Sequence, residues 1–413
     1  MSQISLESTA ATSNQQRWTL ASTSAGFALE NMDVMLLSFA LSSIITDLHL
    51  SAGQAGLISS ITNVGMLVGG LIFGLIGDRY GRVKTFSYTI FIFAFATTAM
   101  AFANSINLIY LCRFLTGIGA GGEYGVGIAL ISERFASNQI GRKTSVAAIG
   151  GQIGAVFAAI LAAIILPRLG WHALFLIGLI PVGLTYFVRR HVHETPAFIQ
   201  AHQTKSTAHF TIAPLFNSPR IAYQTIALTV MSVVQIAGYF GLMNWLPAIM
   251  QKQLHVSVAG SSIWMLATIG GMIIGMMTFG QILDHFGPQI AFGLFLTGAA
   301  LSVYIFTLAT NISTMLLAGA LIGFFSNGMF GGYGAVISRL YPTDVRSTAN
   351  NVIVNIGRAI GGFSSLAIGV LMEHFSVSVV MMCLAGMYLV SLAVMLTIPA
   401  LRHFKQGRAV AED

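Results

Sequence analysis

Twelve long apolar stretches constrain this chain more than any other feature of its sequence. A helix needs about 20 apolar residues to cross roughly 30 Å of hydrocarbon. Most of the stretches reach that length, and we therefore expect an all-α membrane protein with twelve transmembrane helices. The stretches lie at about 18–44, 54–76, 84–104, 107–132, 144–167, 171–188, 221–249, 258–283, 289–309, 312–340, 348–372 and 376–401.

The scarcity of charge agrees with a membrane environment. Only 8% of the 413 residues are charged, whereas soluble globular chains carry roughly a quarter. The 44 glycines fit the same environment, because small residues let membrane helices pack closely. The net charge of +7 is spread singly or in twos and threes, so it does not indicate a phosphate-binding patch. We expect contact with the lipid bilayer and no nucleic-acid partner.

The placement of the cations predicts the topology. If the N-terminus is cytoplasmic, sixteen of the 20 Lys and Arg residues fall in inner loops and tails. Only Arg168 and Lys252 fall in outer loops, and Arg113 and Arg358 lie within spans. Cytoplasmic loops of membrane proteins carry an excess of Lys and Arg. Both termini are therefore expected in the cytoplasm, with the protein in the cell (inner or plasma) membrane.

The two halves of the sequence repeat each other at an offset of 206 residues. With six spans in each half, the halves share one orientation, so we predict a parallel duplication related by a pseudo-two-fold axis. We expect six-helix bundles at 1–188 and 221–413, and a cytoplasmic linker with a short surface helix at 189–220. The repeated residues are Gly65, Gly69, Gly74, Asp78 and Gly81 in the first half and Gly271, Gly275, Gly280, Asp284 and Gly287 in the second.

Several of these residues form motifs that resemble the major facilitator superfamily. The segment from Gly74 to Arg82 matches its signature loop between helices 2 and 3, and Gly280 to Gly287 is similar to the weaker second copy. Arg113 to Gly119 matches its helix 4 motif. The resemblance implies two six-helix bundles that work by alternating access. It also implies that the loop Asp caps a helix of the opposite half and latches the inner gate, with a role for Gly74, Asp78, Gly81, Arg82, Gly280, Asp284 and Gly287.

A narrower resemblance is to organic-acid/proton symporters, which carry aromatic acids, niacin, sialic acid and other carboxylates. Glu30-Asn-Met-Asp33 stands where that group has a D-G-x-D motif, with Glu and Asn in place of the first Asp and the Gly. The segments Gly121 to Tyr124, Tyr239 to Pro247 and Tyr341 to Ala349 are also similar to that group.

Three carboxylates lie well inside the predicted spans, at Glu30, Asp33 and Glu123. Glu30 and Asp33 are three residues apart and share one helix face. Two carboxylates in a low-dielectric site resist double ionisation, so at least one is expected to hold a proton near neutral pH. That property suits proton-coupled transport. The alternative is a structural pair, hydrogen-bonded to helix backbone or bridged to Arg113.

Arg113 and Asp33 lie at depths that permit an ion pair. In proton-coupled sugar carriers of the superfamily, a helix 1 carboxylate pairs with this motif arginine and protonation breaks the pair. The resemblance gives that role to Asp33 and Arg113. A permanent structural salt bridge is the alternative. Glu123 lies in the same predicted span as Arg113, deeper in the membrane. Either a coupling role or a packing role is open for it.

Arg358 is the second cation inside a span. Asn351, Asn355 and Arg358 follow the spacing i, i+4, i+7 and form one polar stripe. An arginine fork binds a carboxylate bidentately, so Arg358 is a candidate anchor for an anionic substrate. An interhelical hydrogen-bond role is the alternative. Further candidates for the substrate cavity are Tyr124, Gln152, Gln235, Tyr239, Asn244, Trp245 and Asn327.

Motifs of enzymes are not evident. Gly117 to Gly122 reads G-x-G-x-x-G, but it lies inside an apolar span with no preceding strand, so close helix packing explains it better than dinucleotide binding. The sequence has no H-E-x-x-H, G-x-S-x-G or G-x-x-x-x-G-K motif. We expect no enzyme activity, metal or cofactor, with the proton as coupling ion.

The combined prediction is a secondary transporter that takes up a small organic anion with protons, as a monomer. A drug/proton antiporter is the first alternative, although residues 150–154 lack the proline of the antiporter motif. A sugar or polyol facilitator is the second, and the cationic Arg358 argues against a neutral substrate.

Overall fold

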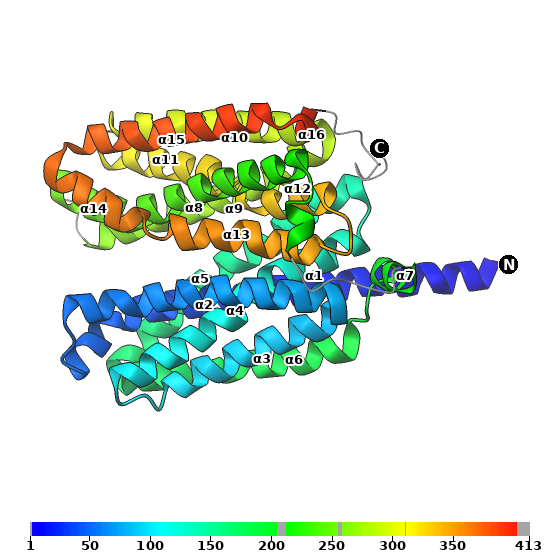
Figure 1. Ribbon diagram of the computed structural model, residues 1–413. Coiled ribbons are helices and arrows are strands. Elements are labelled where there is room, and N and C mark those ends of the chain that lie inside the picture. The colour runs from blue at the N-terminus through cyan, green and yellow to red at the C-terminus, as the bar shows by residue number, and fades with distance from the viewer. Residues whose placement is uncertain (1, 205–211, 255–257, 310, 403–413) are drawn as a thin grey trace. The chain divides into compact units, whose positions relative to one another are not determined.

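The computed structural model describes residues 2–204, 212–254, 258–309 and 311–402, and every regular element in these ranges is helical (Figure 1). The elements in chain order are α1 (Ser2–Asp47), α2 (Ala52–Tyr80), α3 (Arg82–Met100), α4 (Ile106–Arg134), η1 (Ser137–Gln139), α5 (Ile140–Phe175), η2 (Leu176–Leu179), α6 (Ile180–His191), α7 (Pro196–Thr204), η3 (Ala213–Leu215), α8 (Pro219–Leu254), α9 (Val258–Phe286), α10 (Pro288–Phe306), α11 (Ile312–Ile322), η4 (Gly323–Asn327), α12 (Phe330–Leu340), α13 (Arg346–Gly361), α14 (Ser364–His374), α15 (Val377–Thr397) and α16 (Pro399–Arg402).

Ten helices of the described ranges are long and apolar enough to cross a membrane. Nine of them each overlap one of the twelve expected stretches. The tenth, Ser137–Val188, has 52 residues and contains two expected stretches, 144–167 and 171–188. Its helix is interrupted at Gly170, whose φ of 73° and ψ of 179° are not helical. The chain is therefore a multi-pass helical membrane protein, as its composition indicated.

The expected stretch at 348–372 is the one that has no match among the ten. It is divided between α13 with 16 residues and α14 with 11, and each is shorter than a membrane span. The division falls at Gly361 and Gly362, where adjacent glycines weaken the helix. The polar residues of α13 lower its hydropathy as well.

The chain forms two compact units. Unit 1 contains Met1–Ala136, Val146–Pro214 and Ile337–Asn355, and unit 2 contains Ser137–Ser145, Leu215–Val336 and Ile356–Asp413. Each unit therefore includes a short segment from the other half of the sequence. The short helix α7 lies within the linker expected at 189–220. The domain boundaries predicted from the repeat stay a prediction.

Glycines bring α2 and α4 of unit 1 into backbone contact. A Cβ added at Gly65 would lie 2.3 Å from the carbonyl oxygen of Phe114, and one at Gly69 would lie 2.0 Å from that of Ile118. From the other side, a Cβ at Gly117 would lie 2.2 Å from the carbonyl oxygen of Thr62. The G-x-G-x-x-G run in α4 is therefore a packing surface.

The same three contacts recur in unit 2 at the same offset of 206 residues. A Cβ at Gly271 would lie 2.1 Å from the carbonyl oxygen of Ala320, and one at Gly275 would lie 2.2 Å from that of Phe324. A Cβ added to Gly323 would lie 2.2 Å from a carbonyl oxygen of α9, that of Thr268. The sequence repeat thus reflects a repeated helix packing within each unit.

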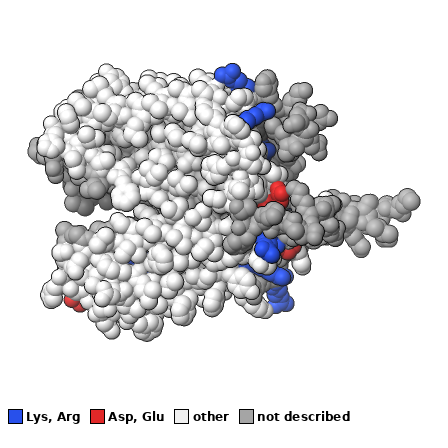
Figure 2. Space-filling model, in the orientation of Figure 1, with Lys and Arg blue, Asp and Glu red and all other residues white. Residues whose placement is uncertain are grey.

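The surface of the molecule agrees with a lipid environment. Charged side chains are sparse along the lengths of the helices on the face drawn in Figure 2, and those visible lie mainly near helix ends. Many exposed side chains are large and apolar, among them Phe95, Phe157, Leu294 and Val390. Inside unit 1, the apolar core around Leu36, Ile58 and Cys112 adjoins the buried charges described below.

We predict opposite effects of the same substitution at two helical glycines. Gly69→Ala should destabilise the protein by about 1–3 kcal/mol, because its methyl group overlaps backbone that cannot move freely. Gly386→Ala, where no atom lies within 4 Å of the added Cβ, should be neutral or stabilise by roughly 0.5–1 kcal/mol through helix propensity. Thermal unfolding of both variants in detergent measures this. Equal melting temperatures would contradict the close contact of α2 and α4.

Candidate functional site

A buried ion pair joins α1 and α4 in unit 1. Nη1 of Arg113 lies 2.9 Å from Oδ2 of Asp33, and both side chains are almost fully buried. The hydroxyl of Thr97 donates to Oδ1 of Asp33 at 2.8 Å. Nε of Arg113 donates to the hydroxyl of Thr62 at 3.2 Å. Four helices, α1 to α4, therefore each contribute one residue to this site.

Because the pair is buried, a change in the charge of either side chain would strongly affect the stability of this site. The surrounding core is apolar, and both threonines are themselves buried. Removing one partner of a buried ion pair leaves an uncompensated charge and costs about 3–5 kcal/mol. Protonation of Asp33 would have the same electrostatic result for Arg113. Their depths in the predicted spans permitted this contact and the family resemblance implied it, whereas its coupling role stays a prediction.

The other two predicted coupling acids lie in the same unit. Glu30 is one turn before Asp33 on α1 and is 6% exposed. Glu123 of α4 is fully buried and packs against α1, since a Cβ added at Gly26 would lie 2.2 Å from Oε1 of Glu123. Because Gly26 and Glu30 are one helical turn apart, they share a face of α1. All three acids thus belong to the buried interior of unit 1.

Asn351 and Asn355 bind the backbone of α4 in this structure. Oδ1 of Asn351 accepts from the N–H of Gly125 at 2.6 Å, and its Nδ2 donates to the carbonyl oxygen of Gly122 at 3.2 Å. Nδ2 of Asn355 donates to the carbonyl oxygen of Gly121 at 2.8 Å. These contacts give both amides an interhelical role, while substrate binding by them stays a prediction.

The remaining candidates differ in their surroundings. Arg358, in the part of α13 that belongs to unit 2, is partly exposed. Gln152 of α5 is buried, and the ring of Tyr124 stacks on that of Phe27 at a centroid distance of 5.4 Å. The side chains of Asn244 and Trp245 lie outside the described part of the structure.

Unit 2 brings three of the predicted polar candidates together. Nε2 of Gln235 donates to Oδ1 of Asn327 at 3.0 Å. Asn327 ends the π-helical turn η4, a type of irregularity that is frequent at functional sites. Tyr239, Met272 and Asn327 are among the residues that line a small hollow beside it, together with Met243. The residues around this hollow are apolar, aromatic and amide groups, the chemical types that line small-molecule sites, but the hollow has no room for a molecule in this structure.

A second polar site lies at the end of α2 in unit 1. The carboxylate of Asp78 accepts from the backbone N–H groups of Ser347 at 3.0 Å and Thr348 at 2.7 Å, and from the hydroxyl of Thr348 at 2.7 Å. It thus caps the first turn of α13, where unpaired N–H groups and the helix dipole favour negative charge. The following turn is made by Gly81, with a φ of 117°.

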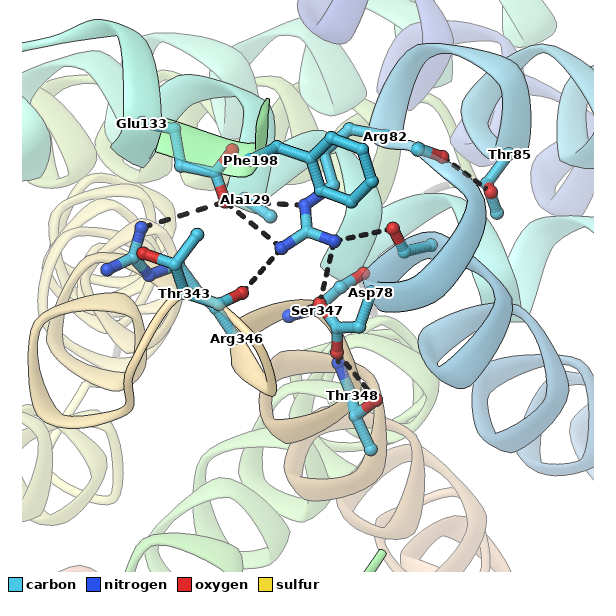
Figure 3. A network of polar contacts seen from close by, with 12 residues as sticks. Asp78, Arg82, Thr85, Ala129, Glu133, Phe198, Thr343, Arg346, Ser347 and Thr348 are labelled. Atoms are coloured by element: carbon cyan, nitrogen blue, oxygen red, sulfur yellow. Dashed lines mark hydrogen bonds and ion pairs between the residues drawn. The ribbon is translucent and has the colours of Figure 1, made fainter. Parts of the chain in front are cut away.

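Arg82 connects this cap to a wider network (Figure 3). Its Nη1 lies 3.0 Å from Oδ1 of Asp78, and its Nη2 lies 3.2 Å from Oε1 of Glu133. Arg346, the first residue of α13, lies 3.7 Å from the same carboxylate oxygen. The guanidinium also lies 4.9 Å from the ring centroid of Phe198 on α7. Arg82 is fully buried, so its charge is compensated by protein groups instead of water.

The segment before α7 completes the network. Glu194 accepts from the N–H of Arg82 at 2.8 Å and that of Val83 at 3.0 Å, and so caps the start of α3. Thr195 donates a short hydrogen bond to Glu133. The predicted linker is thereby bound to the ends of α3 and α4 within unit 1.

Unit 2 repeats the cap in the reciprocal sense. Asp284 of α9 accepts from the N–H of Gly141 and that of Arg142, each at 2.8 Å. These two donors precede Ser347 and Thr348 by 206 residues, the same offset that relates Asp78 to Asp284. Gly287 makes the following turn with a φ of 86°. The helix cap implied by the resemblance is present in both units.

Sequence reasoning did not identify several residues of these two sites. Thr62 and Thr97 carry no signal in the sequence, because buried threonines are common in membrane helices. Glu133 lies at the end of a span and Glu194 in the predicted linker, and at both places an acid is ordinarily solvated. No group of three or more possible metal ligands occurs among the described residues.

Fold and buried charges define a multi-pass helical membrane protein with an internal repeat, and comparison with known proteins gives its family. The sequence of this chain matches the family model of the Major Facilitator Superfamily over residues 23–290 and 228–412. The chain belongs to this superfamily. It is a transporter and not an enzyme.

Individual relatives have informative names. A protein of Haemophilus influenzae described as a metabolite transport protein is 37% identical over 94% of this chain and 98% of its own length. A protein of Cupriavidus pinatubonensis described as a 4-methylmuconolactone transporter is 29% identical over 89% of this chain and 86% of its own. A protein of Bacillus subtilis described as a niacin/nicotinamide transporter is 28% identical over 88% of this chain and 91% of its own length. The names match the organic-acid branch that the motifs resemble.

A solved structure supports the fold independently. The proton:xylose symporter XylE, with 15% identity, covers 94% of this chain and 96% of its own chain at a TM-score of 0.80. At that identity the similarity concerns the fold alone.

Two neighbouring cations allow a test of the network around Arg82. Arg82→Gln should lower the free energy of unfolding by about 3–5 kcal/mol, because Asp78 and Glu133 would lose their shared partner in a buried site. Lys84→Gln, two residues away and exposed, should change it by less than about 0.5 kcal/mol. Chemical unfolding in detergent checks both. Similar values for the two variants would contradict the network.

Proposed function

We propose that this protein is a proton-coupled symporter that takes up a small organic anion across the cell membrane by alternating access. The observation that carries the proposal is the buried pair of Asp33 and Arg113, accompanied by Glu30 and Glu123 in the same unit. Ionisable groups inside membrane helices are costly, and they commonly mark proton relays and substrate pathways. The proposal includes function as a monomer and the proton as coupling ion.

The proposed topology has twelve membrane-spanning helices in two parallel six-helix repeats, with both termini in the cytoplasm. The interruption at Gly170 supports two spans within Ser137–Val188. The pair α13 and α14 supplies the remaining span, broken at its glycines. The contacts repeated at 206 residues support a parallel relation of the repeats, and the distribution of Lys and Arg supports the orientation.

Proton coupling follows from competition for Asp33. While Asp33 is ionised, Arg113 is neutralised and α1 is held to α4. When Asp33 takes a proton, the ion pair is lost, and Arg113 retains only its hydrogen bond to Thr62 among the contacts described above. The arrangement of the four helices is then less strongly held. Protonation thereby changes the stability of one conformation relative to another, which is the requirement for coupling.

The proposed substrate class follows from Arg358 and from the names of the relatives. Niacin is a pyridine carboxylate and is anionic near neutral pH. A guanidinium binds such a carboxylate with two parallel hydrogen bonds. Aromatic and amide groups such as Tyr239, Gln235 and Asn327 suit the ring of a small acid. Arg358 would anchor the charge and the other groups would select the ring.

Alternating access requires the cytoplasmic ends of the helices to separate and rejoin. The caps of Asp78 on α13 and of Asp284 on α5 are suited to act as latches, because each consists of a few directional hydrogen bonds at a helix end. The inward-open state of the proposed cycle would break them.

Transport by purified protein in liposomes tests the coupling. An inward proton gradient should drive accumulation of labelled nicotinate, and Asp33→Asn should abolish accumulation while leaving counterflow. Asp47→Asn, the same change at an exposed position of α1, should transport as the wild type does. The test is repeated with benzoate and cis,cis-muconate. Uptake of these acids by the wild type without any response to the gradient would refute proton coupling.

A matched pair of ligands tests the anchor. Nicotinate should raise the melting temperature of the purified protein more than nicotinamide, which has the same ring but no negative charge. Arg358→Gln should remove the difference, whereas Arg168→Gln in a predicted outer loop should keep it. Binding to the native state stabilises a protein by RT ln(1 + [L]/Kd), so the melting shift reports affinity. Equal shifts in wild type and Arg358→Gln would exclude Arg358 as the anchor.

A further inference from the structure

One face of α1 carries a buried stripe that extends well beyond the two acids. Thr19, Thr23, Gly26, Glu30 and Asp33 follow one another at intervals of four, three, four and three residues, so they lie along one side of the helix. The four side chains of the stripe are at most 6% exposed. The stripe connects the acids to the N-terminal part of α1, where the membrane-spanning segment begins at Ser13.

Three buried hydroxyl groups in this part of α1 have no partner among the described residues. The side-chain oxygens of Thr19, Ser22 and Thr23 are buried and have no hydrogen-bond partner in the described part of the chain. Buried polar atoms are nearly always paired, either with protein or with ordered water. Three adjacent unpaired hydroxyls therefore indicate a site for water molecules inside unit 1.

Glu123 and Thr23 lie at successive contacts between α1 and α4. Oε1 of Glu123 occupies the space left by Gly26, at 2.2 Å from the position of an added Cβ. One turn further along α4, Cγ2 of Thr23 lies 2.9 Å from the corresponding position at Gly127. The two glycines thus let a carboxylate and a threonine sit side by side in the helix interface.

We propose that Thr19, Ser22 and Thr23, with water between them, form a proton relay that connects Glu123 and Glu30 to the N-terminal end of α1. The proposal rests on the proposed proton coupling and assigns the route by which the proton leaves. That route runs through the interior of unit 1 and does not require the substrate path. Gly26 is a positioning residue, because it allows Glu123 to reach the stripe.

Each transfer in the relay conserves the hydroxyl groups. A protonated carboxyl of Glu123 gives its proton to a neighbouring water, which passes a proton to the oxygen of Thr23, and that oxygen releases its own proton to the next water. The hydroxyls of Ser22 and Thr19 repeat the exchange, and bulk water at the helix end takes up the proton. Rotation of each hydroxyl restores the starting state, so one proton crosses without net change in the protein.

Water is necessary because the distances are large. Eleven residues separate Thr19 from Glu30, which corresponds to about 16 Å along the helix. Three hydroxyls alone cannot bridge that length with hydrogen bonds of about 2.8 Å. Among the charged and titratable residues that contact α1 from other helices, Arg113 pairs with Asp33 and Glu123 lies against Gly26. Arg134 accepts through its carbonyl oxygen from Gln16, and the ring of His191 lies against Trp18. Residues 150–154 of α5, which contact α1 between Ser24 and Asn31, are uncharged, and α3 contributes the uncharged Phe86 and Thr97.

Transport by variants of the stripe tests the relay. Thr23→Val keeps the shape of the side chain but removes its hydroxyl, and should lower gradient-driven accumulation of nicotinate, benzoate or cis,cis-muconate about tenfold or more. Counterflow, which needs no net proton movement, should be retained. Thr23→Ser should restore accumulation. Thr278→Val, at a partly exposed position of α9 in unit 2, is the matched control.

The outcomes separate this inference from the proposed function. If the wild type shows no response to the gradient, proton coupling itself fails, and the relay fails with it. If the wild type responds and both Thr19→Val and Thr23→Val accumulate substrate normally, the coupling stands and the relay is overturned. Equal loss of accumulation and counterflow would show a structural role and would also overturn it.

A second measurement needs no substrate. Infrared spectra can follow the exchange of a protonated carboxyl from hydrogen to deuterium after transfer of the protein into D2O, with the band of Glu123 assigned by Glu123→Gln. Thr23→Val should slow this exchange about tenfold, because proton transfer through the missing hydroxyl is lost, and Thr23→Ser should not. Gly26→Ala should shift the band by displacing the carboxyl. An exchange rate unchanged in Thr23→Val would overturn the proposal.

Discussion

The structure depends on ion pairs between charged side chains that are buried away from water. Asp33, Arg113, Asp78 and Arg82 are all buried, and each has an opposite charge within 3.0 Å. Isolated ions in such surroundings are strongly unfavourable, so these side chains hold their helices together wherever they remain ionised. The two ion-pair sites differ in what surrounds them. Asp33 is embedded in apolar core, whereas Asp78 lies in a network that includes helix ends and the segment before α7.

Close packing at glycine makes these arrangements possible. The approach of α2 to α4 in unit 1, and of α9 to α11 and η4 in unit 2, brings backbone against backbone. In a bilayer, such contacts replace the hydrophobic effect as a source of helix association. Gly26 and Gly127 also leave space between helices, but side chains fill that space instead of backbone. Glu123 lies against Gly26, and Thr23 lies against Gly127. A small residue can thus serve either helix packing or the placement of a polar group.

Much of the fold could be predicted from the lengths and repetition of the apolar stretches, because a helix that crosses the bilayer must be apolar over about 20 residues. Apolar length predicted the helices, and the 206-residue repeat predicted packing that recurs in both units. The depths of Asp33 and Arg113 allowed their contact, and the family resemblance predicted it. Hydrogen-bond partners such as Thr62, Thr97 and Glu194 could not be predicted. Their contacts depend on the rotation of each helix and on which distant segments lie close together, and sequence periodicity gives neither. The break between α13 and α14 was missed for a related reason: mean hydropathy does not register where paired glycines end a helix.

The reciprocal caps have a consequence for the order in which the chain can be completed during synthesis. Asp78 is made 269 residues before Ser347, whose N–H it accepts. Gly141 likewise precedes Asp284, its acceptor, by 143 residues. When the first half has emerged from the ribosome, it therefore contains a carboxylate that has Arg82 but lacks its donors on α13, and a helix start without its acceptor. Neither cap can form until the second half is made, so a chaperone or translocon that shields these groups would have most to protect during that interval.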